Sequence, residues 1–248
     1  MSSAMDAHRQ RAYDVRCEWG QAGLEAVGED VAAVVIVDVL SFSTAVDVAV
    51  SRQAQVLPFR WRDDSASAYA RQHGAQVARP RGEAGGLSLS PASLMRINAG
   101  TRLVLPSPNG STLSLQPRGP AVFAGCLRNA RAVADAANAL GRPVAVIPAG
   151  ERWPDGTLRP AVEDLVGAGA ILRHLAGAAS PEARAAIGMF EQFAEEIEMV
   201  LFECASGREL ADNGYAEDVR IASELDVSDA VPRLADKAYV HAAPMRDE

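Results

Sequence analysis

The chain has 248 residues, of which 48% are hydrophobic and 23% charged, and its formal net charge is −8. This is the composition of a globular protein, and it excludes fibrous, disordered and membrane-embedded classes. The acidic balance opposes binding to nucleic acid or to an anionic membrane, so an anionic substrate needs a local positive site. No apolar run is long enough for a spanning helix or a signal peptide, and three distant cysteines argue against a disulfide framework, so we expect a cytoplasmic protein.

The first predicted strand covers residues 32–37 and ends at Asp38. Its uninterrupted run of alanine, valine and isoleucine is typical of a strand buried on both faces, as in parallel sheets flanked by helices. A helix follows, and the hydroxyls of Ser41, Ser43 and Thr44 lie near its N-terminus, where free backbone N–H groups favour anions. An acid beside an anion-binding turn indicates a metal and a phosphate.

Strands and helices alternate along the rest of the chain. Further strands are predicted at residues 55–59, 102–106, 121–125 and 143–148, and helices at residues 65–72, 130–140, 162–175, 181–204, 206–213 and 217–225. This alternation predicts an α/β fold, layered as α/β/α around a mostly parallel sheet. We expect one α/β catalytic domain over residues 1–248, with two interleaved α/β subdomains as the alternative. Residues 1–12 are expected to form a flexible N-terminus, and residues 227–234 a terminal connection.

Polar loops follow four of the predicted strands. Because the carboxyl ends of parallel strands share one edge of a sheet, we expect these four loops to converge there. Their chemically distinctive residues are Asp38, Asn109, Gly110, Ser111, Arg128, Asn129, Glu151, Glu163 and Asp164. A fifth loop, rich in glycine and serine at residues 79–91, carries Arg81 and Glu83, and its glycines allow close approach to a ligand.

The sequence lacks the motifs of several classes of phosphate enzyme. It contains no P-loop, no nucleophile elbow and no dinucleotide-binding loop. Asp38 lacks the second aspartate of the aspartyl-phosphate phosphatases, and Ala132, six residues after Cys126, stands where a cysteine phosphatase needs arginine. A metal-assisted displacement remains, in which Mg²⁺ takes oxygen ligands from carboxylates, phosphate and water.

Five acids are candidates for binding such an ion or for acting beside it in catalysis: Asp38, Glu83, Glu151, Glu163 and Asp164. Because the adjacent Glu163 and Asp164 point about 100° apart on a helix, we expect one of them to bind or orient and the other to cap. The candidates for holding the phosphate are the backbone N–H groups after Gly110 and near Asn129, together with Arg128 or Arg152.

Several short motifs occur in a fixed order along residues 32–232. They are Val37-Asp38-Val39-Leu40, Arg81-Gly82-Glu83, Asn109-Gly110-Ser111, Asn129-Ala130, Ala149-Gly150, Glu163-Asp164-Leu165, Ser206-Gly207-Arg208, Glu217-Asp218-Val219 and Asp229-Ala230-Val231-Pro232. In order and spacing this set resembles the 2-phosphosulfolactate phosphatases. The resemblance implies an α/β protein that uses Mg²⁺ to hydrolyse the phosphomonoester of a small sulfonated hydroxy acid, a step toward coenzyme M. One departure is Ser41, which stands where the family usually has arginine.

We therefore predict a Mg²⁺-dependent phosphatase for a small anionic phosphomonoester, either 2-phosphosulfolactate or, given Ser41, a different small phosphorylated acid. We assign catalysis to Asp38, Glu163 and Asn109, and metal binding to Asp38, Glu83, Glu151 and Asp164. Substrate binding is assigned to Arg81, Ser43, Thr44, Gly110, Ser111, Arg128 and Asn129. The alternatives are a non-catalytic phosphate- or anion-binding protein on the same fold and a phosphoryl- or acyl-transfer enzyme. We expect a homodimer, as is common for cytoplasmic enzymes, with neither nucleic acid nor membrane as a partner.

Overall fold

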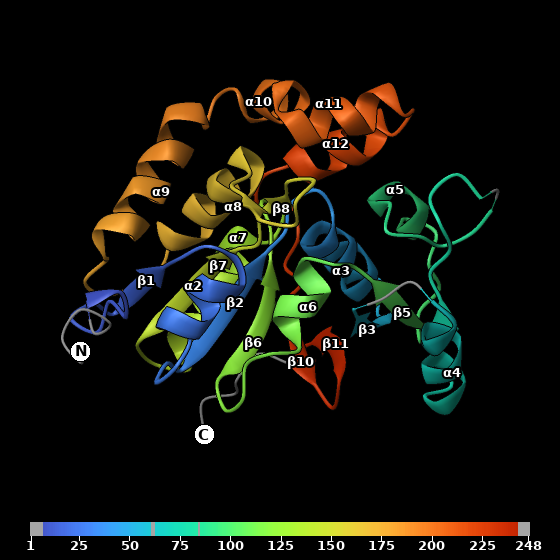
Figure 1. Cartoon of the computed structure of the whole chain (residues 1–248), viewed down its shortest axis with the longest axis horizontal. Coiled ribbons are helices and arrows are strands. Elements are labelled where there is room, and N and C mark those ends of the chain that lie inside the picture. The colour runs from blue at the N-terminus through green and yellow to red at the C-terminus, as the bar shows by residue number, and fades with distance from the viewer. Residues whose placement is uncertain (1–6, 61–62, 84, 243–248) are drawn as a thin grey trace.

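The computed structural model describes residues 7–60, 63–83 and 85–242. Within them a nine-stranded sheet lies between two layers of helices (Figure 1). Seven of the nine strands belong to two parallel groups, and the other two form an antiparallel hairpin between the groups. The predicted α/β/α layering around a mostly parallel sheet is therefore confirmed.

Four parallel strands form one side of the sheet. In spatial order they are β1 (Val15–Cys17), β7 (Val144–Pro148), β2 (Ala33–Val37) and β6 (Ala121–Gly125). Val37 at the end of β2 is level with Pro148 of β7 and with Gly125 of β6. The loops that follow these three strands therefore leave the sheet next to one another.

The other side of the sheet consists of the parallel strands β3 (Gln55–Phe59), β5 (Arg102–Pro106) and β4 (Gln76–Val77). A hairpin of β10 (Pro232–Ala235) and β11 (Ala238–His241) joins the two sides through antiparallel pairing with β6 and β3. Three successive antiparallel pairings mean that β3, β5 and β4 run opposite to the first four strands. The prediction that all four polar loops leave one edge of a single parallel sheet is therefore wrong for the loop after β5.

Strand β2 is buried on both faces, as its sequence predicts. Val34 and Ile36 belong to the apolar core beneath α2 (Gly20–Val27), α3 (Phe42–Ser51), α5 (Pro91–Leu94) and α6 (Gly110–Ser114). Val35 and Val37 belong to the core beneath α7 (Ala130–Ala139), α8 (Val162–Leu172) and α9 (Pro181–Phe193). The strand that delivers Asp38 is thus held rigidly between two helical layers.

The remaining elements lie around this framework. Helix α4 (Asp64–Gln72) packs beside β4 and β5, and a separate hairpin of β8 (Glu151–Arg152) and β9 (Leu158–Arg159) stands between β7 and α8. Helices α10 (Ile197–Glu203), α11 (Ala205–Asp212) and α12 (Ala216–Ser223) pack on one another at the top of Figure 1, and α12 also contacts α5. These last three helices are called the helical cap below.

Two predicted elements differ from the structure. The single helix expected over residues 181–204 is wrong, because the chain turns at residues 194–196 and divides it into α9 and α10. The terminal connection expected over residues 227–234 is also wrong, because this segment enters the β10–β11 hairpin. Asp236 and Lys237 at its turn have φ angles of 47° and 69°, as a two-residue hairpin turn requires, but without the glycine or asparagine that usually marks such a turn.

The N-terminal segment that was predicted to be flexible is described only from residue 7 onward, and residues 1–6 lie outside the described part. Gln10 within it is buried. Its Nε2 donates to the carbonyl oxygen of Cys17 at 2.9 Å, and its Oε1 accepts from the backbone N–H of Cys17 at 3.1 Å. These two hydrogen bonds attach the segment to β1.

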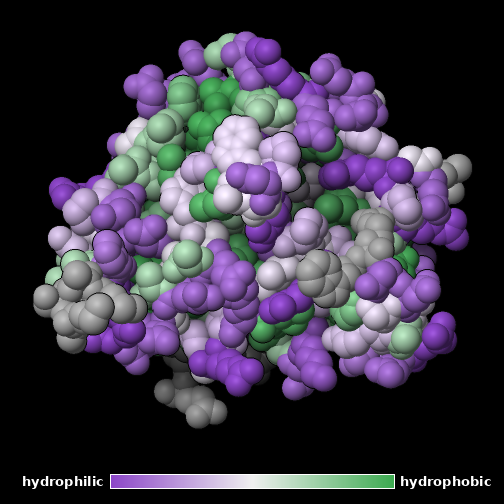
Figure 2. Space-filling model, in the orientation of Figure 1, coloured by the Kyte–Doolittle hydropathy of each residue, from purple (hydrophilic) through white to green (hydrophobic). Residues whose placement is uncertain are grey.

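The surface is mostly hydrophilic. Figure 2 shows hydrophilic side chains over most of the face in view, with hydrophobic side chains gathered beside α9 and α10. Among the described residues, no helix combines the length and the hydropathy needed to cross a bilayer.

Candidate active site

Asp38, at the end of β2, holds two loops together. Its Oδ1 accepts a hydrogen bond from the backbone N–H of Phe42 at 3.1 Å, and its Oδ2 accepts one from Gly110 at 2.9 Å. Because Gly110 begins α6, this contact brings the loop after β5 to Asp38 although β5 and β2 run in opposite directions. A β-carbon on Gly110 would lie 2.2 Å from the Phe42 ring and 2.8 Å from Asp38 Oδ2, so only glycine fits.

Asp164, in the first turn of α8, holds the loop after β7 in the same way. Its Oδ1 accepts from the backbone N–H of Val39 at 2.7 Å, and its Oδ2 accepts from Gly150 at 2.8 Å. Gly150 has a φ of +65°, a conformation that favours glycine. Two buried aspartates therefore join the loops that follow β2, β5 and β7.

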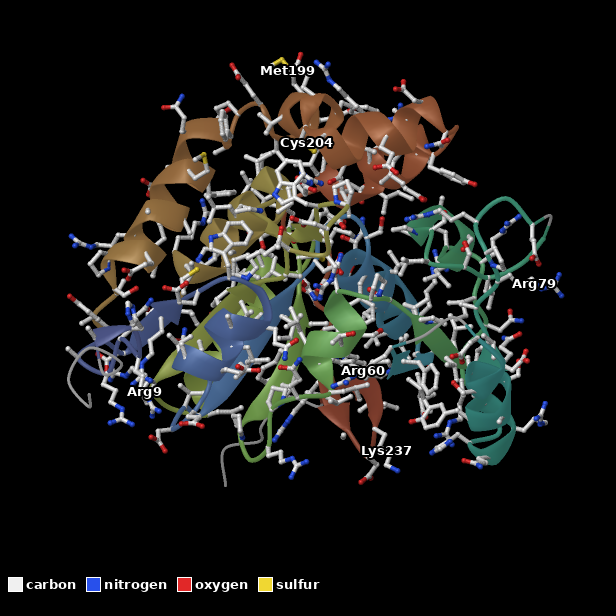
Figure 3. All side chains as sticks on the ribbon, in the orientation of Figure 1. Arg9, Arg60, Arg79, Met199, Cys204 and Lys237 are labelled. Carbon is white, nitrogen blue, oxygen red and sulfur yellow. The ribbon has the colours of Figure 1, made fainter. Side chains whose placement is uncertain are left out.

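Glu163 is also buried, but its carboxylate makes no hydrogen bond to a backbone N–H in the described part of the chain. Its charge acts on the thiol of Cys204, which lies where α10 meets α11 (Figure 3). Its charge acts on Asp38, Asp164 and Glu151. Glu163 and Asp164 therefore differ in their surroundings: Asp164 joins two loops, whereas Glu163 lies among the other acids. Neither side chain caps α8, so the expected cap is wrong.

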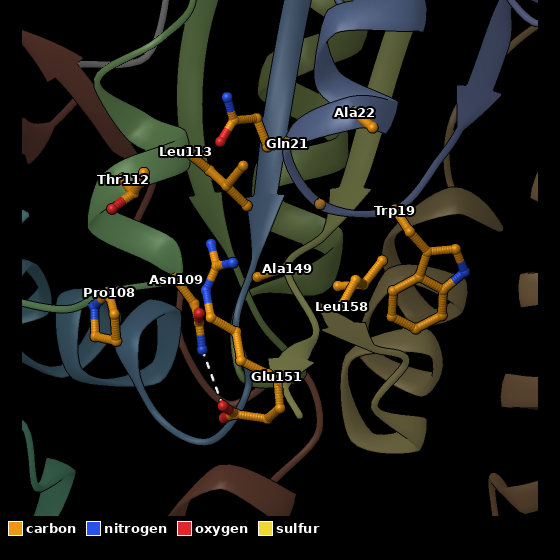
Figure 4. A pocket seen from close by; sticks show the side chains of 12 residues that line it. Trp19, Gln21, Ala22, Pro108, Asn109, Thr112, Leu113, Ala149, Glu151 and Leu158 are labelled. Atoms are coloured by element: carbon orange, nitrogen blue, oxygen red, sulfur yellow. Dashed lines mark hydrogen bonds between the residues drawn. The ribbon is translucent and has the colours of Figure 1, made fainter. Parts of the chain in front are cut away.

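Glu151 lies at the start of β8, beside a cavity of about 140 Å³ (Figure 4). Its Oε2 accepts a hydrogen bond from Nδ2 of Asn109 at 2.9 Å, so residues from the loops after β5 and β7 meet at the cavity wall. The other walls include Trp19, Gln21, Thr112, Leu113, Arg152 and Leu158. The cavity is therefore lined by both polar and apolar side chains, and it opens beside Asn109 and Glu151, two of the predicted site residues.

Burial and mutual repulsion raise the pKa values of three acids here. Burial and the charge of Glu163 raise the pKa of Asp38, although its two backbone hydrogen bonds and Arg81 oppose the shift. Burial, Asp38 and Glu163 raise the pKa of Asp164 well above its usual range. Burial and repulsion by Asp38 raise the pKa of Glu151 to about 7. Each shift means that a negative charge is disfavoured in this place.

The four acids carry more charge than the neighbouring cations balance. Arg81 acts on Asp38 and Arg159 acts on Glu151. In the described residues no three histidine, cysteine, aspartate or glutamate side chains converge as a ready metal site. Mg²⁺, however, often takes only one or two carboxylates together with water and phosphate oxygens, and a cation would relieve the repulsion. The residues therefore fit such an ion, and Glu151 and Glu163 would hold it because no backbone N–H engages either carboxylate.

The three predicted substrate-binding hydroxyls are directed at the backbone. Ser43, Thr44 and Ser111 are fully buried, and each donates a hydrogen bond to a carbonyl oxygen. The acceptors are Ile36, Val39 and Leu105, at 2.9, 2.8 and 2.9 Å respectively. These hydroxyls fix the turns after β2 and β5, and their binding of substrate stays a prediction.

The predicted binding residues after β6 are engaged elsewhere. Nε of Arg128 pairs with Oδ2 of Asp47 at 2.9 Å, and its Nη1 pairs with Glu224. Asn129 is fully buried and bonds only to backbone and thiol groups of Cys126, Ala124 and Ala230. No hydrogen bond or ion pair of these two side chains reaches the four acids. The structure therefore does not connect them to the acidic site, although their loop leaves the sheet beside it.

The glycine-rich loop contributes one of its two predicted residues to the site. Nη2 of Arg81 donates to Oγ of Ser41 at 2.7 Å, three residues beyond Asp38. Glu83 is half exposed and lies 3.9 Å from Arg79. The structure therefore places Arg81 beside the acids and turns Glu83 toward the surface.

Sequence reasoning did not single out four residues that adjoin the site. They are Trp19, Arg159, Cys204 and Asp218. Asp218 belongs to the motif Glu217-Asp218-Val219, so its motif was a usable signal. The other three belong to none of the motifs quoted above, and only the folded chain shows that they lie near the acids.

Comparison with known proteins places this geometry in context. A sequence model for a family described as 2-phosphosulpholactate phosphatase matches residues 24–237. A 2-phosphosulfolactate phosphatase from Methanothermobacter thermautotrophicus strain Delta H is 29% identical over 205 residues, which are 82% of this chain and 86% of the relative. The range that the family model matches includes all four acids and the Arg81 loop.

Proposed function

The chain belongs to the 2-phosphosulfolactate phosphatase family, and on that premise we propose that it is a Mg²⁺-dependent phosphatase for a small phosphorylated hydroxy acid. The observation that carries this proposal is a group of four acids, the buried Asp38, Glu163 and Asp164 and the half-buried Glu151, whose negative charge the nearby arginines do not balance. A divalent cation and a bound phosphoryl group complete such a site.

Each residue has a separate part in the proposed reaction. Mg²⁺, held by Glu151 and Glu163, would supply positive charge to offset the charge of the phosphoryl oxygens. Glu163 accepts a proton from the attacking water at a carboxylate oxygen, and the same proton goes to the departing alkoxide, so that one water is consumed and an alcohol and phosphate are formed. Asn109 fixes Glu151, and Asp38 and Asp164 fix the loops that surround the phosphoryl group. Arg81 contacts a phosphate oxygen.

The proposed substrate is 2-phosphosulfolactate, which would be converted to sulfolactate and phosphate on the route to coenzyme M. Two observations support a small substrate. The relative from M. thermautotrophicus is named for this activity, and the cavity beside Glu151 has a volume of only about 140 Å³. Arg152, in the cavity wall, provides a positive charge for an acidic group of the substrate.

We place the reaction in the cytoplasm. Cys17, Cys126 and Cys204 are all free, which suits a reducing compartment. We propose a homodimer as the working assembly on general grounds, because closed dimers are the commonest oligomers of such enzymes. Analytical ultracentrifugation of the purified chain tests this assembly.

The substrate proposal is tested by measuring phosphate release from a panel of small phosphomonoesters. The panel contains 2-phosphosulfolactate, its carboxylate analogue 2-phospholactate, and p-nitrophenyl phosphate, each assayed with Mg²⁺ and with EDTA. We expect Mg²⁺-dependent release that is fastest for one of the two phosphorylated hydroxy acids. Absence of release from every compound contradicts the proposal, and calorimetric binding of phosphate without turnover identifies the chain as an anion-binding protein instead.

A further inference from the structure

Arg81 is held on three sides beside the acidic site. Its Nη2 donates to Oγ of Ser41 at 2.7 Å and contacts the carbonyl oxygen of Leu89 at 3.4 Å. Its guanidinium carbon lies 5.5 Å from the centre of the Tyr215 ring, and its Nε lies 3.5 Å from Oδ2 of Asp218. Nη1 makes no hydrogen bond within the described residues, so this nitrogen is available to a ligand.

Asp218 comes from the helical cap and is almost completely buried, with 1% of its side chain exposed. Its two oxygens have different partners. Oδ1 accepts hydrogen bonds from Oγ of Ser90, in the glycine-rich loop, and from the backbone N–H of Ala92, in α5, at 3.1 Å. Oδ2 has no hydrogen-bond partner among the described residues, and neither has the buried Nε of Arg81, so each atom is balanced only by the other's charge.

The neighbouring backbone is shaped to permit this arrangement. Gly82 directly follows Arg81 and has a φ of +88°. A β-carbon at this position would lie 3.2 Å from the hydroxyl oxygen of Tyr215. The loop therefore passes close to the helical cap at the residue next to Arg81, and Tyr215 and Asp218, which lie three positions apart, meet the guanidinium together.

We propose that Asp218 and Ser41 are positioning residues that fix the guanidinium of Arg81, so that its free edge binds an oxygen of the substrate's phosphate group. The inference rests on the proposed function for the identity of the anion. Asp218 holds the Nε edge and Ser41 holds Nη2, which leaves Nη1 for a ligand on a guanidinium whose charge acts on Asp38. A preorganised guanidinium binds an anion more tightly than a mobile one, because less side-chain freedom is lost on binding.

The Asp218→Asn variant separates positioning from simple support of the loop. An asparagine carbonyl can still accept the hydrogen bonds of Ser90 and Ala92 at the Oδ1 position. At the Oδ2 position, however, an amide nitrogen replaces a carboxylate oxygen and faces Arg81 without a charge. The matched control is Ser90→Ala, which removes a loop contact of Asp218 and leaves the Arg81–Asp218 pair in place.

The experiment is a calorimetric titration with inorganic phosphate in the presence of Mg²⁺, on the wild type and on the variants D218N, R81A, D218N/R81A and S90A. We expect D218N and R81A each to weaken phosphate binding about tenfold, the effect of losing roughly one charge-assisted hydrogen bond. Because Asp218 acts through Arg81, the double variant binds no more weakly than R81A alone. S90A lowers the melting temperature and leaves the phosphate affinity within about twofold of the wild type.

The inference is overturned if D218N binds phosphate as tightly as the wild type, or if the effects of D218N and R81A add in the double variant. If D218N does not fold, Ser41→Ala tests the same guanidinium. We expect this variant to bind phosphate several-fold more weakly than the wild type, and an unchanged affinity overturns the inference. Phosphate binding without any turnover contradicts the proposed function but leaves the inference standing. A wild type that binds no phosphate contradicts both.

Discussion

Asp47 on one side, and Asp38 and Asp164 on the other, are similarly buried but differ in the charges around them. Asp47, in the middle of α3, is fully buried, and Asp38 and Asp164 are 5% and 4% exposed. Nε of Arg128 lies 2.9 Å from Asp47, and Oγ of Ser228 donates to it at 2.6 Å. Asp38 and Asp164 instead receive only backbone N–H groups and lie near a further acid, Glu163.

The comparison shows what distinguishes a structural acid from a functional one here. Burial raises the pKa of Asp47 as it raises the pKa of Asp38 and of Asp164. The negative charge of Asp47, however, is met by an arginine of the same chain, so this pair is complete without a ligand. In the acidic site only Arg81 and Arg159 act on the four acids, and the cation that we propose would balance the remaining charge.

The largest expected effect comes from Asp38→Asn. An asparagine accepts only one of the two N–H groups that Asp38 binds, and it removes a negative charge from the proposed metal site. We expect the rate of phosphate release to fall about a thousandfold. The control is Glu83→Gln, on the exposed part of the glycine-rich loop, which should retain activity within about twofold. Equal losses in both variants would show that activity does not depend on the acids around Asp38.

The Arg128→Met variant tests the ion pair between Arg128 and Asp47. Removing the arginine leaves the buried Asp47 without its cation, and the free energy of unfolding should fall by about 3–5 kcal/mol, measured by urea denaturation. The turnover of the folded fraction should stay close to that of the wild type. A variant of normal stability whose affinity for substrate is reduced would instead support the predicted binding of substrate by Arg128.

The adjacent acids of α8 provide a closer contrast. Glu163→Gln should lower turnover about a hundredfold, because an amide cannot take a proton from water, while the stability changes little. Asp164→Asn should lower the free energy of unfolding by about 1–3 kcal/mol, because one of its two backbone N–H partners is left without an acceptor. Denaturation and phosphate release, measured on both variants, test whether Glu163 serves turnover and Asp164 serves stability. Identical behaviour of the two variants would contradict these separate roles.

The smallest expected effect is on the pH dependence of stability. In metal-free protein the pKa of Glu151 is raised to about 7, above its value in the unfolded chain, so the folded state binds this proton more tightly. The melting temperature should therefore fall as the pH rises from about 4.5 to about 7. In Glu151→Gln this decrease should be smaller, although Asp38 and Asp164 still contribute to it. A decrease of the same size in both proteins would contradict the raised pKa of Glu151.

Much of the fold could be predicted from local patterns. The apolar run before Asp38 predicts a strand buried on both faces, and β2 has this environment. The hairpin β10–β11 could not be predicted in this way, because its strands are short and its turn, Asp236-Lys237, carries no glycine. Its insertion between β6 and β3 reverses the direction of β3, β5 and β4, and such long-range pairing has no local signal.

In the candidate site, too, contacts between residues far apart in the sequence could not be predicted from local patterns. Asp38, Glu151 and the Glu163–Asp164 pair lie in one region as predicted, because the parallel strands β2 and β7 end next to each other. Asn109 reaches the same region although β5 runs the opposite way, which the alternation of strands and loops does not predict. The sequence does not reveal that Arg128 pairs with Asp47, which lies 81 residues away. The choice between a buried partner and a substrate is made by tertiary packing, and for Arg128 the packing supplies the partner.

The most direct test of the acidic site is the effect of Mg²⁺ on the melting temperature of the wild type and of the double variant E151Q/E163Q. Binding at a Mg²⁺ concentration of 100 Kd should stabilise the wild type by about 2.7 kcal/mol, a rise of roughly 5–10 °C for a chain of this size. The double variant should melt higher than the wild type without metal and gain nothing from Mg²⁺. An equal rise in both proteins, or no rise in either, would contradict the assignment of these acids to a cation site.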